Sequence, residues 1–167
     1  MTATQTSRKP ATKLSRFRVR TVTPEDASAW LEMRVALWPD PDSALHASEI
    51  EDFFVGKLRE PLQALIALDD EDNRLGFAEL SIRVYAEGCD TDNVGYLEGW
   101  YVLPDARRRG VGRALLVAAE DWAREQGCTE FGSDALIDNE VSAAAHHALG
   151  FEEVARVRCF RKDLSPR

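Results

Sequence analysis

Residues 107–113 combine arginines with glycines, between an apolar segment and an amphipathic one. Glycine has no side chain, so the backbone at Gly110 and Gly112 can approach a ligand closely. The first N–H groups of a following helix have no partner inside the helix, and with the helix dipole they favour an anion. Arginines add positive charge that suits a polyphosphate. The pattern predicts a phosphate-binding loop made of Arg107, Arg108, Arg109, Gly110, Val111, Gly112 and Arg113.

Another interpretation of this segment is a glycine-containing turn beside a solvated basic cluster. Two common nucleotide-binding motifs are excluded, because the chain has neither Gly-Lys-Ser/Thr nor the GxGxxG spacing here. If the loop holds phosphate, it therefore does so by a different pattern.

Glu98 lies just upstream of the loop, between Tyr96 and Trp100. On a strand these three side chains would share one face, because side chains alternate. The charged form of a carboxylate among aromatic rings is disfavoured unless it meets a cation or a donor. Such a group suits a general base or an anchor for an ammonium group, and the alternative is a solvated glutamate on an edge strand. The neighbouring Gly99 indicates a bulge or a close approach by ligand.

The elements that would position these residues are read from periodicity and from breakers such as Pro39, Pro41, Gly127 and Gly150. Hairpins in the first half and βαβ units in the second predict an α/β fold with a mixed sheet and helices on both faces. Residues 1–15 are expected to be a disordered tail and residues 16–167 a single domain. Strands are expected near 16–22, 63–68, 75–85, 94–103, 130–133 and 154–160, and helices near 23–38, 46–58, 110–126 and 140–149.

Composition narrows the choice of partner and compartment. The net charge of −8 argues against nucleic acid and makes a cationic small molecule a natural ligand. No stretch reaches the roughly 20 apolar residues of a membrane span, and the first 15 residues lack the apolar core of a secretory signal. We therefore expect a cytoplasmic protein that does not bind membranes.

No metal site is expected. Cys89, Cys128 and Cys159 are far apart and include no CxxC pair, which also argues against a disulfide framework. His146 and His147 are adjacent, and adjacent side chains on a helix point apart.

The spacing of Arg107, Gly110 and Gly112 after a strand resembles the pyrophosphate loop of the GNAT family of N-acetyltransferases. The resemblance implies acetyl-CoA as cosubstrate and a GNAT fold, in which a pair of strands splays apart at a bulge. It further implies that the backbone of Trp100, Tyr101 and Val102 binds the pantetheine arm, with an N–H near Val102 facing the oxyanion. Glu98 would take a proton from the amine.

His146 stands four residues before Gly150, in a Leu-Gly-Phe motif. Many GNAT enzymes have a tyrosine at that position, so the resemblance makes His146 a candidate proton donor to the leaving thiolate. It could equally be an exposed helix residue without a role.

Further segments resemble the bacterial aminoglycoside 6'-N-acetyltransferases, including 37–39, 76–83, 85–90, 96–99, 133–134 and 146–153. That resemblance covers about residues 16–162 and implies acetyl transfer to a 6'-amine, which confers antibiotic resistance, and a homodimer. For Trp38 and Tyr85 the alternative is core packing, and for Asp134 a helix cap. The implied substrate contacts are Trp38, Tyr85, Glu98 and Asp134, to which we add Glu79 as an acid on the neighbouring strand; the implied cofactor contacts are Trp100 to Val102, Arg108 to Arg113, and Asn139.

The chain departs from this pattern at Ala155, where relatives carry another acid, and at Trp100, where an aliphatic residue is usual. Two other functions therefore stay open. One is a GNAT enzyme for a different amine, such as a polyamine, an amino sugar or a protein N-terminus. The other is an acyl-CoA-binding module without catalysis.

Overall fold

The computed structural model describes residues 17–39 and 43–164. The predicted tail over residues 1–15 and the predicted helix breaker Pro41 lie outside these ranges. The elements in chain order are β1 (Phe17–Thr21), a 3-10 turn η1 (Pro24–Asp26), α1 (Ala27–Leu37), α2 (Ser43–Phe54), β2 (Gln63–Asp69), β3 (Arg74–Arg83), β4 (Val94–Val102), a 3-10 turn η2 (Pro104–Ala106), α3 (Val111–Glu125), β5 (Glu130–Ser133) and α4 (Glu140–Ala148).

The strands form one five-stranded sheet in the order β1-β2-β3-β4-β5. Neighbours from β1 to β4 are antiparallel, and β5 joins β4 in parallel after the crossover through α3. The mixed sheet expected from the sequence is therefore confirmed.

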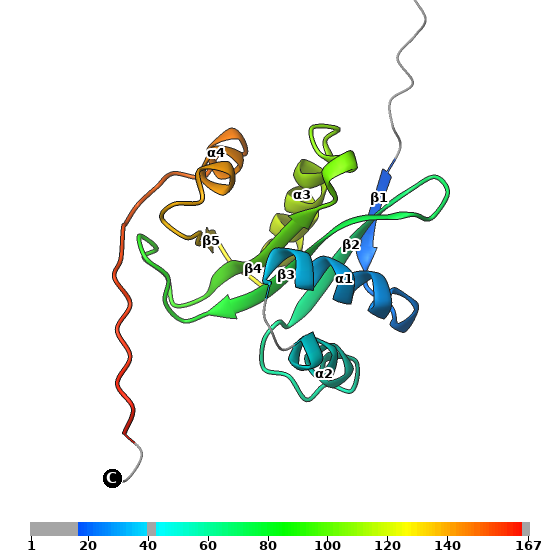
Figure 1. Ribbon diagram of the computed structural model, residues 1–167. Coiled ribbons are helices and arrows are strands. Elements are labelled where there is room, and N and C mark those ends of the chain that lie inside the picture. The colour runs from blue at the N-terminus through cyan, green and yellow to red at the C-terminus, as the bar shows by residue number, and fades with distance from the viewer. Residues whose placement is uncertain (1–16, 40–42, 165–167) are drawn as a thin grey trace, which may run out of the picture.

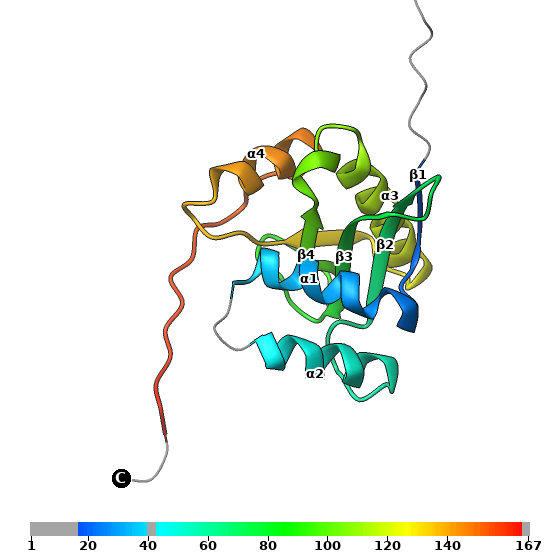
Figure 2. The same cartoon turned by 45° about the vertical axis from the view of Figure 1, so that its right-hand side comes forward.

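Helices cover both faces of the sheet (Figures 1 and 2). On one face, Trp30 of α1 and Ile50 of α2 pack with Phe77 in a buried apolar cluster. On the other face, Leu115 of α3 packs with Leu80 in a second cluster. β2 and β3 lie between these layers and are buried along most of their length, as their near-continuous apolar sequences require.

The entry into α1 is held by a buried carboxylate. Thr23 and Asp26 form the two sides of a capping box, and the Asp26 side chain is 0% exposed. It receives hydrogen bonds from Arg20 at 2.6 Å and from Arg74 at 2.9 Å. Burial alone would raise the pKa of Asp26, but the hydrogen bonds from Arg20, the Thr23 amide and Arg74 hold it well below its usual range.

A bulge interrupts β4 at Glu98. In the pairing of β3 with β4, Glu79 lies opposite Gly99 and Leu80 lies opposite Leu97, so Glu98 is the extra residue. The bulge reverses the alternation, because Leu97 before it and Trp100 after it both pack on the α3 side. The expectation that Trp100 shares a face with Tyr96 and Glu98 is therefore wrong.

β4 and β5 separate at their C-terminal ends. Their pairing ends with Leu97 opposite Ser133, whereas β4 continues to Val102. Beyond Leu97 the backbone edge of β4 that faces away from β3 has no β5 partner. This is the splayed strand pair that the resemblance implies, and the bulge at Glu98 lies where the splay begins.

The strand expected at 154–160 is absent from the sheet. Residues 151–164 run out from the end of α4, away from the sheet (Figure 1), without regular secondary structure. An isolated strand has no ladder of hydrogen bonds to stabilise it, and within the described ranges no strand pairs with this segment. Val154 does contact Gly88, but Val157 and Phe160 stay 63% and 91% exposed.

Candidate active site

The predicted phosphate loop lies at the N-terminus of α3. Gly110 is the N-cap of this helix and has a φ of +93°, a conformation that favours glycine. The first helical hydrogen bond runs from Ala114 N to Gly110 O at 3.0 Å. The preceding N–H groups of Val111, Gly112 and Arg113 are thus the ones that a helix start leaves free for an anion.

The absence of a side chain at Gly112 allows packing against Trp100, as well as the close approach of a ligand to the backbone. A Cβ at this position would come within 2.7 Å of the Trp100 ring. The Trp100 Nε1 atom is buried and has no hydrogen-bond partner among the described residues. A donor left without a partner beside a helix N-terminus suits an acceptor-rich ligand such as the phosphate and amide groups of acetyl-CoA, so the residues present fit this cosubstrate.

Two of the loop arginines bind the protein itself. Arg107 Nε donates to Val102 O at 2.9 Å, and its guanidinium lies 5.6 Å from the centroid of the Tyr101 ring. Arg113 Nη2 donates to Ala148 O at 3.4 Å, which links the start of α3 to the end of α4. Arg107 therefore steadies the end of β4. Arg108 and Arg109 are exposed at the tip of the turn, and Arg108 has a φ of +57°.

Glu98 is not a free carboxylate. Arg83 Nε donates to Glu98 Oε1 at 2.9 Å and Arg83 Nη2 donates to Oε2 at 2.5 Å, a bidentate pair. Ser81 Oγ donates a further short hydrogen bond to Oε1. The Glu98 side chain is 19% exposed, so it lies at the edge of solvent while its two oxygens are engaged.

Asp134 lies close to this group. Tyr96 donates its hydroxyl proton to Asp134 Oδ2 at 3.0 Å, and Arg83 lies 3.5 Å above the Tyr96 ring. Burial and the neighbouring Asp134 raise the pKa of Tyr96 well above its usual value, so the phenol stays protonated as a donor. Glu98 and Asp134 therefore flank one region, with Tyr96 and Arg83 between them.

Trp38 lies against the strand that carries Glu98. Its ring contacts Gly99, where a Cβ would come within 2.3 Å of the indole. The His46 ring stacks on it at a centroid distance of 6.3 Å, and the Arg34 guanidinium lies 5.4 Å from its centre. The Trp38 side chain is half-buried, so it combines the packing role with a surface open to ligand.

Glu79 does not present its carboxylate to a ligand. It is 2% exposed, accepts a hydrogen bond from Trp30 Nε1 at 2.8 Å and forms an ion pair with Arg34 at 2.9 Å. Burial raises the pKa of Glu79 to about 7, although Arg34 and Trp30 act in the opposite direction. A substrate ammonium could reach this carboxylate only by breaking that cluster. We therefore correct its predicted role from substrate contact to support of Arg34 and, through Arg34, of Trp38.

Two further predicted contacts are Tyr85 and Asn139. Tyr85 follows β3 and is 67% exposed, so it is not a core residue. Asn139 caps α4, because its side chain accepts a hydrogen bond from Ser142 N at 3.0 Å. Its capping bond uses the side-chain oxygen and leaves the amide N–H groups for another partner.

His146 is held by hydrogen bonds at both ring nitrogens. Nδ1 lies 2.8 Å from Ser142 O, and since a carbonyl only accepts, Nδ1 carries a proton. Nε2 lies 3.0 Å from Ser133 Oγ, which is 3.2 Å from Leu97 O. The edge-to-face contact with Trp100, at 5.6 Å, places His146 beside the splayed strand.

Sequence reasoning missed the groups that orient the predicted residues. Ser81 and Arg83 stand two apart on β3, and this spacing places both on the face that carries Glu79. That alternation was a usable signal for a cation near Glu98. Arg34 and Ser133 had no such signal, because their partners come from distant segments.

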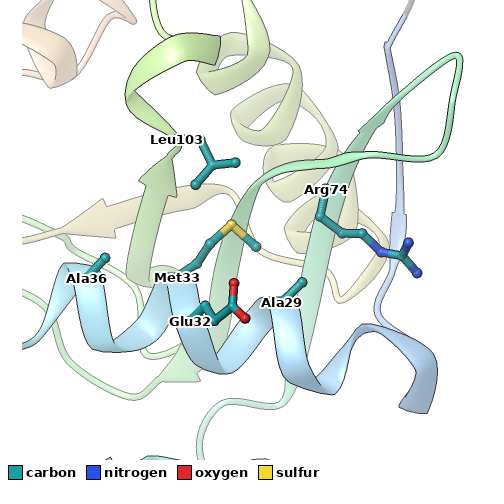
Figure 3. Close-up of a pocket in the computed structure, with 6 residues that line it drawn as sticks. All are labelled: Ala29, Glu32, Met33, Ala36, Arg74 and Leu103. Carbon is teal, nitrogen blue, oxygen red and sulfur yellow. The ribbon is translucent and has the colours of Figure 1, made fainter.

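A separate small cavity lies between α1 and the sheet (Figure 3). It measures about 100 Å³, well below the roughly 300 Å³ at which ligand sites begin. None of its lining residues belongs to the predicted site. They are Ala29, Glu32, Met33, Ala36, Arg74 and Leu103.

Two other kinds of feature are absent from residues 17–39 and 43–164. No helix there is long and apolar enough to cross a membrane. No three His, Cys, Asp or Glu side chains gather there in a way that could hold a metal ion.

Comparison with known proteins agrees with this geometry. The model of the acetyltransferase (GNAT) family matches residues 27–151. The aminoglycoside N(6')-acetyltransferase type 1 of Klebsiella aerogenes is 57% identical over 146 residues, which covers 87% of this chain and 96% of that protein.

Solved structures show the same likeness. AAC(6')-Iy in complex with the bisubstrate analogue CoA-S-monomethyl-acetylneamine superposes with a TM-score of 0.81 at 37% identity, covering 89% of this chain and 99% of that one. AAC(6')-Ih from Acinetobacter baumannii gives a TM-score of 0.81 at 36% identity, covering 90% and 100%. Together with the mixed sheet, the splayed strand pair and the glycine-capped start of α3, these matches show that the chain belongs to the GNAT family of acetyltransferases.

Proposed function

We propose that this protein transfers the acetyl group of acetyl-CoA to the 6'-amine of aminoglycosides. The observation that carries the proposal is the arrangement along β4. An acidic, aromatic-lined region at Glu98 leads through an unpaired strand edge to an anion site at the start of α3. A polycationic amine and a CoA thioester would meet along this one strand. The relatives that carry the name aminoglycoside N(6')-acetyltransferase support the substrate class.

The loop and the splayed strand would hold acetyl-CoA, which supplies an activated acetyl thioester. The free N–H groups at the start of α3 would bind its pyrophosphate, with Arg108 and Arg109 adding charge. Trp100, Tyr101 and Val102 would bind the pantetheine arm through their backbone. An N–H near Val102 would stabilise the oxyanion as the carbonyl is attacked.

Glu98 would accept the proton that the amine must lose before it attacks. An ammonium group has no lone pair, so the C–N bond cannot form until a proton leaves. Glu98, directly or through water, is the carboxylate beside the splay. As the C–S bond breaks, His146, which lies against Trp100 of the splayed strand, would return a proton to the thiolate.

Charge and aromatic surface would select the substrate. Aminoglycosides carry several ammonium groups on sugar rings. Glu98 and Asp134 would pair with the ammonium groups, and the rings of Trp38 and Tyr85 would lie against sugar or cation. Ala155 offers no further carboxylate, so this site holds less acid than the pattern of its relatives implies.

The test is thiol release from acetyl-CoA with a panel of aminoglycosides, polyamines, amino sugars and short peptides. The proposal predicts turnover of aminoglycosides above all other classes. Preference for a polyamine or a peptide would replace it with another GNAT activity. Binding of acetyl-CoA with no acceptor in the panel would favour a non-catalytic module.

We also propose a cytoplasmic homodimer in which residues 16–167 form one domain. The segment from 151 to 164 supports the dimer, because it exposes Val157, Phe160 and Leu164 along an extended chain. A second copy could cover these side chains. Light scattering of the full-length chain should give a mass of two chains. Truncation after Gly150 should reduce the measured mass to that of one chain. A monomeric full-length chain would contradict the dimer.

A further inference from the structure

Arg83 occupies the place where a substrate ammonium would be expected. Its guanidinium pairs with both oxygens of Glu98, at 2.9 and 2.5 Å. It also lies 3.5 Å above the Tyr96 ring, whose hydroxyl binds Asp134. Two carboxylates and an aromatic face are the groups that would recognise an amine, and here they surround a cation of the chain itself.

The position of Arg83 allows this cation to leave. Arg83 is the last residue of β3, and the next residues, Val84 and Tyr85, are 80% and 67% exposed. Its own side chain is 31% exposed, so it can turn towards water without opening the sheet. Glu98 would keep its Ser81 hydrogen bond when Arg83 departs.

We propose that Arg83 is a specificity-determining residue, an internal cation that holds the ammonium site until a multiply charged substrate displaces it. The proposal rests on the proposed function for the identity of the substrate. While Arg83 is bound, hydrogen bonds from Arg83 and Ser81 take up three of the roughly four acceptor positions of Glu98, and the guanidinium neutralises the charge that would attract an amine proton. Displacement therefore both admits the ammonium and releases the carboxylate. An amine with a single charge gains too little elsewhere in the site to replace a bidentate guanidinium, so Arg83 excludes it.

In competition of this kind, the apparent affinity equals the intrinsic affinity multiplied by the fraction of molecules in which the site is open. Removing the competitor should therefore tighten binding. The opposite expectation follows if Arg83 only orients Glu98, because its removal would then weaken binding or leave it unchanged.

The experiment compares wild type with Arg83→Gln by calorimetric titration without acetyl-CoA. The probes are neomycin, which carries several ammonium groups, and methyl 6-amino-6-deoxyglucoside, which carries one. We expect Arg83→Gln to bind neomycin about tenfold more tightly and to gain measurable binding of the monoamine. Arg124→Gln removes an exposed arginine of α3 that pairs with Glu120 and Asp121 of the same helix, and it should bind both probes as wild type does.

Equal or weaker neomycin binding by Arg83→Gln would overturn the proposal. If that variant fails to fold, Arg83→Met, which keeps the apolar contact with Tyr96, takes its place. If wild type neither binds nor acetylates neomycin, the proposed function fails and spermine becomes the probe. Spermine bound no more tightly by Arg83→Gln than by wild type would then overturn the role of Arg83 independently.

Discussion

The indole ring of Trp38 lies so close to Gly99 that a methyl group at position 99 would come within 2.3 Å of it. Gly99 follows the bulge residue Glu98, so the aromatic surface and the carboxylate are fixed by the same two residues of β4. In the proposed function, recognition of the sugar by Trp38 and activation of its amine by Glu98 would therefore be coupled through the bulge.

Gly99→Ala should displace Trp38 and disturb aminoglycoside binding. A misplacement of about 1 Å can cost up to about 100-fold in rate, so we expect kcat/KM for an aminoglycoside to fall by about 10- to 100-fold. The KM for acetyl-CoA should change little. Trp38→Leu should give the same pattern in steady-state kinetics. A loss confined to acetyl-CoA would contradict this placement of Trp38.

Gly112→Asp should abolish acetyl-CoA binding. The new carboxylate would face the pyrophosphate and would also collide with Trp100. Like charges brought together cost several kcal/mol, so affinity should fall on the order of 100-fold or more in a calorimetric titration. Val117→Asp adds the same charge at an exposed position of α3 and serves as the control. Retained affinity in Gly112→Asp would refute the loop assignment.

Glu98→Gln should lower turnover far more than stability. Loss of a general base typically costs about 10² to 10⁴ in rate. Because Glu98 is partly exposed and pairs at the surface with Arg83, the urea midpoint should move little. Paired measurements of kcat and of urea unfolding distinguish the two effects. An unchanged kcat would show that Glu98 is not the general base. Positioning of the two substrates would then account for the rate.

Asp26→Asn should destabilise the fold without touching the site. It breaks a buried pair with Arg20 and Arg74, which typically costs about 3 kcal/mol or more. The pKa of Asp26 is lowered in the folded state, so its contribution is present above the ordinary carboxyl pKa of about 4 and is lost as pH falls below it.

The matching experiment is urea unfolding at several pH values. The free energy of unfolding of wild type should exceed that of Asp26→Asn at neutral pH, and the difference should shrink as pH falls below about 4. Glu32→Gln removes an exposed acid from α1 and should show no such difference. A constant gap across this pH range would show that Asp26 acts through packing alone.

The sequence was sufficient for most of the fold because its signals are local. Thr23-Pro24 marks the start of the first helical segment, Gly127 follows the end of α3, and apolar runs mark β2 and β3. The phosphate loop is local too, since strand end, glycines and helix start are contiguous. These signals located the loop and Glu98 without any knowledge of contacts.

The features that the sequence did not predict depend on contacts between distant segments. Alternation predicted Trp100 beside Glu98, but the bulge set by pairing with β3 turned Trp100 to the α3 face. Glu79 was expected to contact substrate because it is an acid on the strand next to Glu98, yet Trp30 and Arg34 pair with it in the interior. The segment at 154–160 has strand composition, but a strand forms only where a partner edge is available.

The central claim is acetyl transfer to a 6'-amine, and the most direct test uses a matched pair of substrates. Neomycin carries an amine at the 6' position, and paromomycin differs by a hydroxyl there. With acetyl-CoA and purified enzyme, thiol release should be rapid with neomycin and should stay at background with paromomycin. Equal release with both compounds would contradict the regiochemistry, and release with neither would contradict the substrate class.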